Sequence, residues 1–162
     1  MDALIIDKKD NIVDGLNIGY SVNLSYNWSA RFFFIDDKKN IYRKDFFNDE
    51  LQTYFTRYQK YRINPQGKFI RYYEADGFIK NDDEQGLVKN HTREGKWIEM
   101  SNIYYIEKEY KEGVSINEWK YYKMVQNFTE EGYPILSTRR KGDLFYSETY
   151  ENGRLVKREF VK

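Results

Sequence analysis

The stretch GKWIEMSNIYYIEKEYKEGVSINEWKYY, residues 95–122, contains the pattern that decides the fold. It opens on a glycine followed two residues later by a tryptophan, and it ends on a second tryptophan and a tyrosine pair. Within its last part, Trp119 and Tyr121 share one face of an extended chain, whereas Tyr122 faces the other way. Aromatic residues at period two predict β-strands. The acidic-glycine dipeptide at Gly113 predicts a tight turn between two strands, because hairpin turns of this kind need positive φ.

The glycines of the chain recur at a nearly regular interval. Those at positions 77, 95, 113, 132 and 153 lie about 18 to 21 residues apart, enough for two strands and two turns per interval. The surrounding sequence also recurs: SETYENG at 147–153 is similar to EKEYKEG at 107–113, and GKFIRYYEADG occupies 67–77. We therefore predict an antiparallel, almost all-β meander of hairpin repeats in residues 65–162, with turns near Gly77, Gly95, Gly113, Gly132, Gly142 and Gly153.

Residues 1–64 are less regular, and we expect them to add strands to one edge or one face of the repeat segment. The stretch IGYSVNLSYNW predicts a strand, and RFFFI followed by DDKKN and IYRKDFF predicts a hairpin with a charged turn. In residues 47–61 the aromatic residues fall at helical spacing, which leaves a short helix open, although the Thr, Tyr and Phe content favours a strand. The length of 162 residues predicts a single domain, with an irregular β segment at 1–64 and a hairpin-repeat segment at 65–162.

The composition argues against several classes of function. With 27 basic and 26 acidic residues, the chain lacks the basic excess that nucleic-acid or anionic-membrane binding needs. Aromatic and basic residues alternate in YFTRYQKYR and could stack on single-stranded bases, but cross-strand pairs on a solvated sheet account for them better. The chain has no cysteine, and no apolar stretch approaches the roughly 20 residues of a membrane span. If Met1 is the natural start, we expect a cytoplasmic protein.

The sequence predicts no catalytic residues, no cofactor and no metal site. His91 is the only histidine, so it cannot belong to a Cys–His pair or to a multi-histidine metal site. The phosphate-binding glycine motifs are absent. Glu107 and Glu109 share a strand face about 7 Å apart, a spacing that a glycosidase could use. Alternating charges on the solvated face of a sheet produce the same pattern.

Three segments resemble the bacterial branch of the MORN-type repeats, in which G-K-[W/F]-x-x-Y-Y precedes an acidic-glycine turn and E-x-x-Y-x-[D/E/N]-G. The matching residues are Gly67, Phe69, Tyr72, Tyr73, Gly77, Gly95, Trp97, Glu107, Tyr110, Gly113, Trp119, Tyr121, Tyr122, Tyr150 and Gly153. The chain departs from the pattern at Glu118, where glycine is usual, and at Met100, where tyrosine is expected. The resemblance, over residues 65–153, implies a meander of hairpins and a toxin–antitoxin or immunity role, in which the protein neutralises a partner toxin.

Aromatic residues make up 19% of the chain, more than one sheet layer can cover, which favours an aromatic protein-binding face. The candidate contact residues are Tyr72, Tyr73, Trp97, Trp119, Tyr121 and Tyr122. A competing interpretation places the two tryptophans in the core, which leaves the second tyrosine of each pair as the better exposed contact. We therefore predict a non-catalytic protein-binding β-repeat protein of the immunity or antitoxin type. The alternative is a carbohydrate-active hydrolase or carbohydrate-binding module that uses paired carboxylates and aromatic platforms.

Overall fold

The computed structural model describes residues 1–6, 8–9, 12–24, 27–48 and 52–161, and within them the chain is almost entirely β-structure. The helical element of this part is one short 3-10 turn, η1 (Leu136–Thr138). Neighbouring strands pair antiparallel throughout the sheets. The all-β antiparallel fold class is confirmed. No helix in the described residues has the length and apolar composition that crossing a membrane requires.

The chain forms two compact units, Met1–Tyr73 and Glu74–Lys162. The first unit contains a two-stranded sheet and a five-stranded sheet in the order β3-β4-β5-β6-β7. Its strands are β1 (Asp2–Ile6), β2 (Ile12–Asn17), β3 (Tyr20–Leu24), β4 (Asn27–Ile35), β5 (Ile41–Asn48), β6 (Thr53–Ile63) and β7 (Phe69–Tyr72). Ile18, Ala30 and Ile41 are its buried aliphatic residues among those described.

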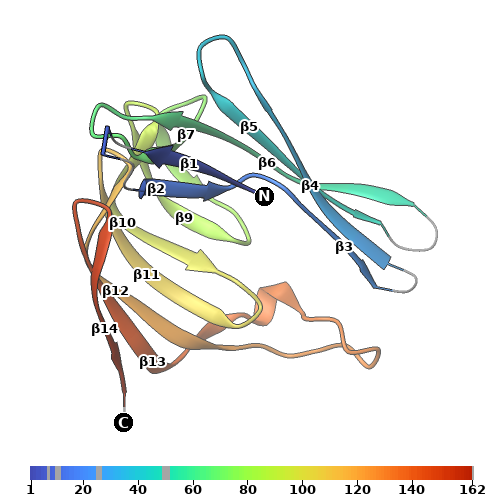
Figure 1. Ribbon diagram of the computed structural model, residues 1–162. Helices are drawn as coiled ribbons and strands as arrows, with labels where there is room; N and C mark the ends of the chain where they lie inside the picture. The colour runs from blue at the N-terminus through green and yellow to red at the C-terminus, as the bar shows by residue number, and fades with distance from the viewer. Residues whose placement is uncertain (7, 10–11, 25–26, 49–51, 162) are drawn as a thin grey trace. The chain divides into compact units, whose positions relative to one another are not determined.

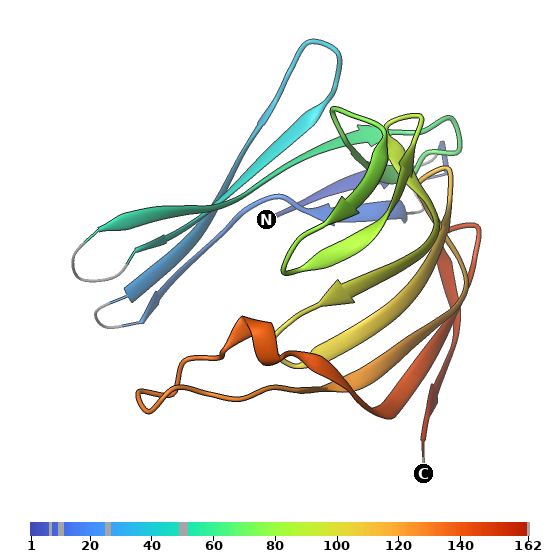
Figure 2. The same cartoon turned by 180° about the vertical axis from the view of Figure 1, so that it is seen from behind.

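The second unit is one seven-stranded meander in which each strand pairs with its neighbours in sequence (Figures 1 and 2). Its strands are β8 (Gly77–Lys80), β9 (Glu84–Lys89), β10 (Thr92–Met100), β11 (Tyr104–Lys111), β12 (Val114–Val125), β13 (Arg140–Glu151) and β14 (Arg154–Phe160). The consecutive hairpins expected here are present. The core of this unit centres on Val88, Trp97, Tyr110 and Trp119.

Three tight turns of the meander have positive φ at both central residues, as a type I′ hairpin turn requires. They are Asn90–His91 with φ of 51° and 62°, Glu112–Gly113 with 51° and 78°, and Asn152–Gly153 with 49° and 76°. The turns predicted at Gly113 and Gly153 are confirmed. Gly132 also lies in a turn, where its N–H donates to the Thr129 carbonyl at 3.0 Å.

The turns predicted at Gly95 and Gly142 are wrong, because both glycines lie inside strands. Gly95 has a φ of 67° within β10, at a bulge where the register with β9 shifts. The hairpin turn comes earlier, at Asn90–His91, because asparagine also tolerates positive φ. At Gly142 in β13, a Cβ atom would lie 2.8 Å from the Lys123 carbonyl oxygen, so this glycine permits a close strand approach. Gly77 begins β8.

Within residues 47–61 the described part is strand except for Gln52, and no helix forms in it. Strand β5 continues through Asn48 and β6 begins at Thr53, while residues 49–51 lie outside the described part. Phe47 pairs directly with Tyr54 across these strands. The boundary expected at residue 64 also shifts, since β7 pairs with β6 and the first unit ends at Tyr73. The single domain expected from the length stays a prediction, with the two units as its parts.

Candidate interaction surface

The two tryptophans predicted as contact residues occupy corresponding positions on β10 and β12. Two residues before each tryptophan, the backbone has positive φ: 67° at Gly95 before Trp97 and 58° at Asn117 before Trp119. The indole N–H of Trp97 donates to the Leu87 carbonyl at 3.1 Å, and that of Trp119 donates to the Glu109 carbonyl at 3.3 Å. Trp97 is 1% exposed and Trp119 is 7% exposed. Both are therefore core residues, as the competing interpretation held, and they cannot form a broad contact face.

An aromatic column links these tryptophans across four strands. Ring centroids lie 6.3 Å apart for Trp97 and Tyr110, 5.3 Å for Tyr110 and Trp119, and 4.3 Å for Trp119 and Tyr150. Ring contacts at these separations add to the burial of apolar area. The column is thus the structural core of one face of the meander.

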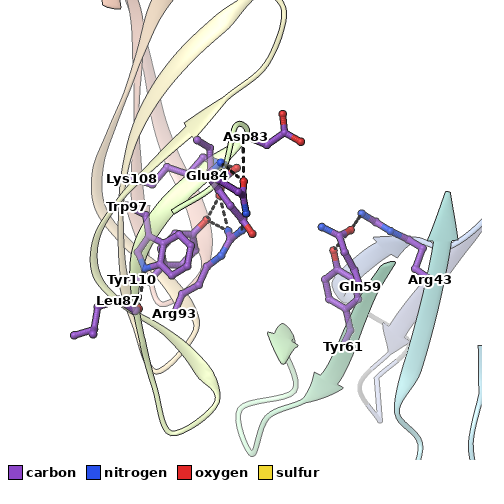
Figure 3. Close-up of polar contacts among 12 residues, drawn as sticks. Arg43, Gln59, Tyr61, Asp83, Glu84, Leu87, Arg93, Trp97, Lys108 and Tyr110 are labelled. Atoms are coloured by element: carbon purple, nitrogen blue, oxygen red, sulfur yellow. Dashed lines mark hydrogen bonds and ion pairs between the residues drawn. The ribbon is translucent and has the colours of Figure 1, made fainter. Parts of the chain in front are cut away.

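A half-buried ionic network lies beside this column on the same face (Figure 3). The guanidinium of Arg93 contacts Glu84 at 2.6 Å and Glu99 at 2.5 Å, and Lys108 donates to Glu99 at 2.7 Å. Burial alone would raise the pKa of Glu99, but Arg93 and Lys108 outweigh it and lower the pKa to about 2. Burial lowers the pKa of Lys108, which its contact with Glu99 opposes. These charges neutralise one another inside the sheet and leave no free acid or base.

Tyr121, another predicted contact residue, serves a second buried carboxylate. Glu148 is 3% exposed and accepts hydrogen bonds from the hydroxyls of Tyr121 at 2.7 Å and Tyr150 at 2.8 Å. The Nε of Arg158 donates to the same carboxylate at 2.9 Å. Burial and the hydrogen bond to Glu148 raise the pKa of Tyr121 far above its usual value. Tyr121 is therefore fixed within the unit by this network.

Tyr122 lies on the opposite face of the meander and is half-buried. Its hydroxyl donates to Glu107 at 3.0 Å, and the ammonium of Lys141 lies 3.8 Å from its ring centroid. Glu107 and Glu109 line a surface depression of about 440 Å³ on this face, together with Lys96 and other residues. This depression therefore contains the two carboxylates that the carbohydrate-hydrolase alternative invokes.

The tyrosine pair at 72–73 belongs to the first unit. Tyr72, on β7, is half-buried beneath Arg62, whose guanidinium carbon lies 3.5 Å from the ring centroid. Tyr73 was expected to be the exposed member of its pair, and this is wrong, because Tyr73 is only 8% exposed. The guanidinium carbon of Arg71 lies 4.7 Å from its ring centroid. The structure thus divides the six predicted residues between the two units and buries three of them.

The largest set of exposed aromatic side chains lies on strands β4–β6 and was not among the predicted contacts. Phe32 and Phe55 are each 57% exposed, Phe34 is 49% exposed and Tyr58 is 43% exposed. Strand pairing places these residues on one face, because Phe32 pairs with Lys44, which pairs with Tyr58 in the next strand. We call this face, formed by Phe32, Phe34, Tyr42, Phe46, Phe55 and Tyr58, the aromatic face.

Ring contacts hold the aromatic face together across the strands. Phe34 stacks on Tyr42 with centroids 4.3 Å apart and an interplanar angle of 3°. Phe46 lies between Phe32 at 5.7 Å and Phe55 at 5.6 Å. A sequence signal for this face existed in the alternation of RFFFI with IYRKDFF, which places aromatic residues opposite one another once the two strands pair.

The opposite face of the same sheet has a polar centre. The guanidinium of Arg31 forms a two-point contact with Asp45, at 2.6 Å and 2.8 Å. The side chains of Arg43 and Tyr61 both donate to Gln59, and Figure 3 shows these three residues together. This face also carries one stacked pair of exposed rings, Phe47 and Tyr54, with centroids 6.4 Å apart. The aromatic face carries the larger set of exposed rings and lacks the polar centre.

Comparison with protein families, with curated proteins and with solved structures gives no match to this chain. Among the described residues there is also no group of three or more His, Asp or Glu side chains arranged to hold a metal ion. His91 lies in the β9–β10 turn, where its backbone N–H donates to Asp76 at 2.7 Å. The functional argument therefore rests on the geometry of the surfaces described above.

Proposed function

We propose that this chain is a non-catalytic protein-binding protein and that the aromatic face of its first unit is the contact surface. The observation that carries the proposal is the exposure of Phe32, Phe34, Phe55 and Tyr58 on one face of the sheet. Exposed apolar area of this kind marks interaction sites, because a partner that covers the rings removes apolar surface from water, which stabilises the complex. Aromatic residues are enriched in such interfaces.

The arrangement of the rings supports a protein partner over a nucleic acid or a sugar. Bases and sugar rings stack on free aromatic faces, whereas Phe34 and Tyr42 lie flat against each other. The phenylalanines of the aromatic face also supply no hydrogen-bonding group to orient a carbohydrate. What the face offers is apolar area and ring edges around the exposed Lys44, which pairs with both Phe32 and Tyr58, and this mixture suits the side chains of a protein surface.

The partner in this proposal is a cognate toxin, and the chain is a cytoplasmic bacterial immunity or antitoxin protein. This finer assignment is supported by the resemblance of residues 65–153 to bacterial MORN-type repeats. The corresponding environments of Trp97 and Trp119 are compatible with that resemblance. The second unit would then act as a scaffold, since its aromatic column is buried.

The alternative of a carbohydrate-active hydrolase has less support. Glycosidases need one carboxylic acid whose pKa is raised so that it can donate a proton. Burial would raise the pKa of Glu107, but its hydrogen bonds from Lys141 and Tyr122 outweigh burial and lower it. Glu109 accepts a hydrogen bond from the Asn117 amide at 2.9 Å. Hydrolysis of soluble polysaccharides that is lost in an E107Q variant would favour this alternative.

The test compares a variant of the aromatic face with a matched control on the other unit. In F32S/F55S the two most exposed rings of the face are replaced, and in F78S a ring that is 69% exposed on β8 is replaced. Each variant is co-expressed with the product of the neighbouring gene, and complex formation is measured by affinity capture and size-exclusion chromatography. We expect F32S/F55S to lose the partner and F78S to retain it. A partner that binds equally to the wild type, F32S/F55S and F78S would contradict the proposed surface.

A further inference from the structure

The turn that joins β4 to β5 is held in one conformation by the side chain of Asp36. Its carboxylate accepts hydrogen bonds from the Asn40 backbone N–H at 2.8 Å, from the Asn40 amide at 2.6 Å and from the Tyr42 hydroxyl at 3.0 Å. Lys39 adopts a φ of 60° within this turn, in the left-handed region that residues other than glycine and asparagine rarely occupy. The turn therefore has a defined backbone conformation, which fixes the Cα positions of Lys38 and Lys39.

Arg62 on β6 is held beside this turn by two contacts. Its Nε donates to the Asn40 side-chain oxygen at 2.8 Å, and its guanidinium carbon lies 3.5 Å from the ring centroid of Tyr72. Asn40 is itself 5% exposed, so the atom that orients the arginine is fixed by burial as well as by Asp36. These contacts use the Nε and one face of the guanidinium, and they leave its two terminal nitrogens as donors.

These groups border a depression of about 560 Å³ lined by Lys38, Lys39, Asn40, Arg62 and Ile63. Three of the five lining residues are cationic, and none of those described as lining it is acidic. A fixed guanidinium fork matches the geometry of phosphate oxygens, and lysine ammonium groups add point charges that favour a dianion over a monoanion. The volume lies in the range of small-molecule sites.

We propose that this depression binds the phosphate group of a small phosphate monoester. Arg62 supplies the paired donors to two phosphate oxygens, while Lys38 and Lys39 neutralise the remaining charge. A carboxylate would match the arginine fork but brings one negative charge, whereas a phosphate dianion brings two to Arg62, Lys38 and Lys39. Asp36 belongs to the same turn but does not line the depression, and its carboxylate is occupied by Asn40 and Tyr42. The proposal is independent of protein binding at the aromatic face.

The test is a titration of the isotope-labelled full chain, followed by amide and arginine side-chain resonances in NMR spectra. The probes are inorganic phosphate, phenyl phosphate as an organic monoester, and acetate, all at constant ionic strength. We expect saturable shifts at Lys39, Asn40 and the Arg62 Nε–H with both phosphate probes, and at least tenfold weaker binding of acetate. Binding of inorganic phosphate without phenyl phosphate, or equal binding of acetate, would overturn the assignment to a phosphate ester.

Matched variants separate a built site from general charge attraction. R62Q should weaken phosphate binding at least tenfold, whereas R154Q removes the same charge from the exposed strand β14 and should leave binding unchanged. R62K keeps the charge without the fork and should bind with intermediate affinity. If R62Q does not fold, K38Q/K39N provides a second test, because asparagine tolerates the positive φ at position 39. Equal loss in R62Q and R154Q, or no loss in K38Q/K39N, would contradict the site.

Discussion

Gly86 shows how one residue of β9 determines the position of a tryptophan on the neighbouring strand. A Cβ atom at this position would lie 2.2 to 2.5 Å from indole carbons of Trp97, far inside contact distance. An alanine here would push the indole out of the core. We expect G86A to lower the free energy of unfolding by about 1–3 kcal/mol, the usual range for overpacking, measured by urea denaturation with tryptophan fluorescence.

The matched control is G95N on the next strand. Gly95 has positive φ but nothing within 4 Å of an added Cβ, and Asn117 occupies the corresponding position before Trp119. Asparagine tolerates this backbone region, so G95N should cost less than about 1 kcal/mol. A G86A variant as stable as G95N would show that the Trp97 packing described here is wrong.

Glu99 should make the stability of the protein depend on pH in the acid range. Its pKa falls from a usual 4.5 to about 2 in the folded protein, so its contribution is complete above about pH 4.5 and is lost as the pH falls towards 2. The shift corresponds to roughly 3 kcal/mol. We expect E99Q to be less stable than the wild type at pH 7 and to show a flatter stability profile between pH 4.5 and 2, measured by urea denaturation.

E130Q is a suitable control for this measurement. Glu130 lies on the exposed loop between β12 and β13, so the variant removes the same charge without touching the Arg93–Glu99–Lys108 network. It should keep the acid profile of the wild type. An E99Q variant whose profile matches that of E130Q would argue against a charged Glu99 held by Arg93 and Lys108.

At the scale of elements, the glycines of two hairpin turns also connect each hairpin to the preceding one. The N–H of Gly113 donates to the Arg93 carbonyl at 2.9 Å, and the N–H of Gly153 donates to the Ser115 carbonyl at 2.8 Å. A valine at either position would be strained at positive φ and would disturb this bond. We expect G113V and G153V each to destabilise by roughly 1–3 kcal/mol in urea denaturation. G113N and G153N, which suit the backbone, should retain most of the stability.

The sequence predicted the strands well and the turns less well, for a local reason. Aromatic residues at period two indicate an extended chain wherever they occur, so the strands of the meander could be predicted from the sequence alone. A glycine at positive φ has the same sequence appearance in a turn, as at Gly113, and in a bulge, as at Gly95. Asn90–His91 carries a turn without any glycine. Only the pairing partners, which lie outside each local stretch, distinguish these cases.

At the scale of the whole molecule, the aromatic face should affect solubility more than stability. Phe32 and Phe55 are more than half exposed, so replacing them removes little buried area. We expect F32S/F55S to bind less of the dye ANS and to self-associate less than the wild type, with a loss of stability of no more than about 1 kcal/mol per ring. Light scattering, dye fluorescence and urea denaturation measure the three effects. Unchanged dye binding would show that the rings are covered in solution.

The sequence could bring these rings together on one face but could not show that the face is exposed, because period two assigns residues to opposite sides of a sheet without saying which side is covered. Trp97 and Phe32 both lie in aromatic-rich strands, yet Trp97 is buried and Phe32 is exposed. The surroundings of Arg62 were equally unpredictable, since Asn40 comes from the turn between β4 and β5 and Tyr72 comes from β7. Which face of a sheet is buried, and which side chains from distant segments meet, depend on the assembled sheets and cannot be deduced from one strand.

The consecutive order of the strands has a consequence for how the protein is made. In both larger sheets each strand pairs only with the strand before it and the strand after it. Such contacts are short in sequence and fold quickly, so each hairpin can form soon after it leaves the ribosome, without waiting for a distant partner. A gene for such a sheet can also gain or lose one hairpin at its end without rerouting the rest of the chain.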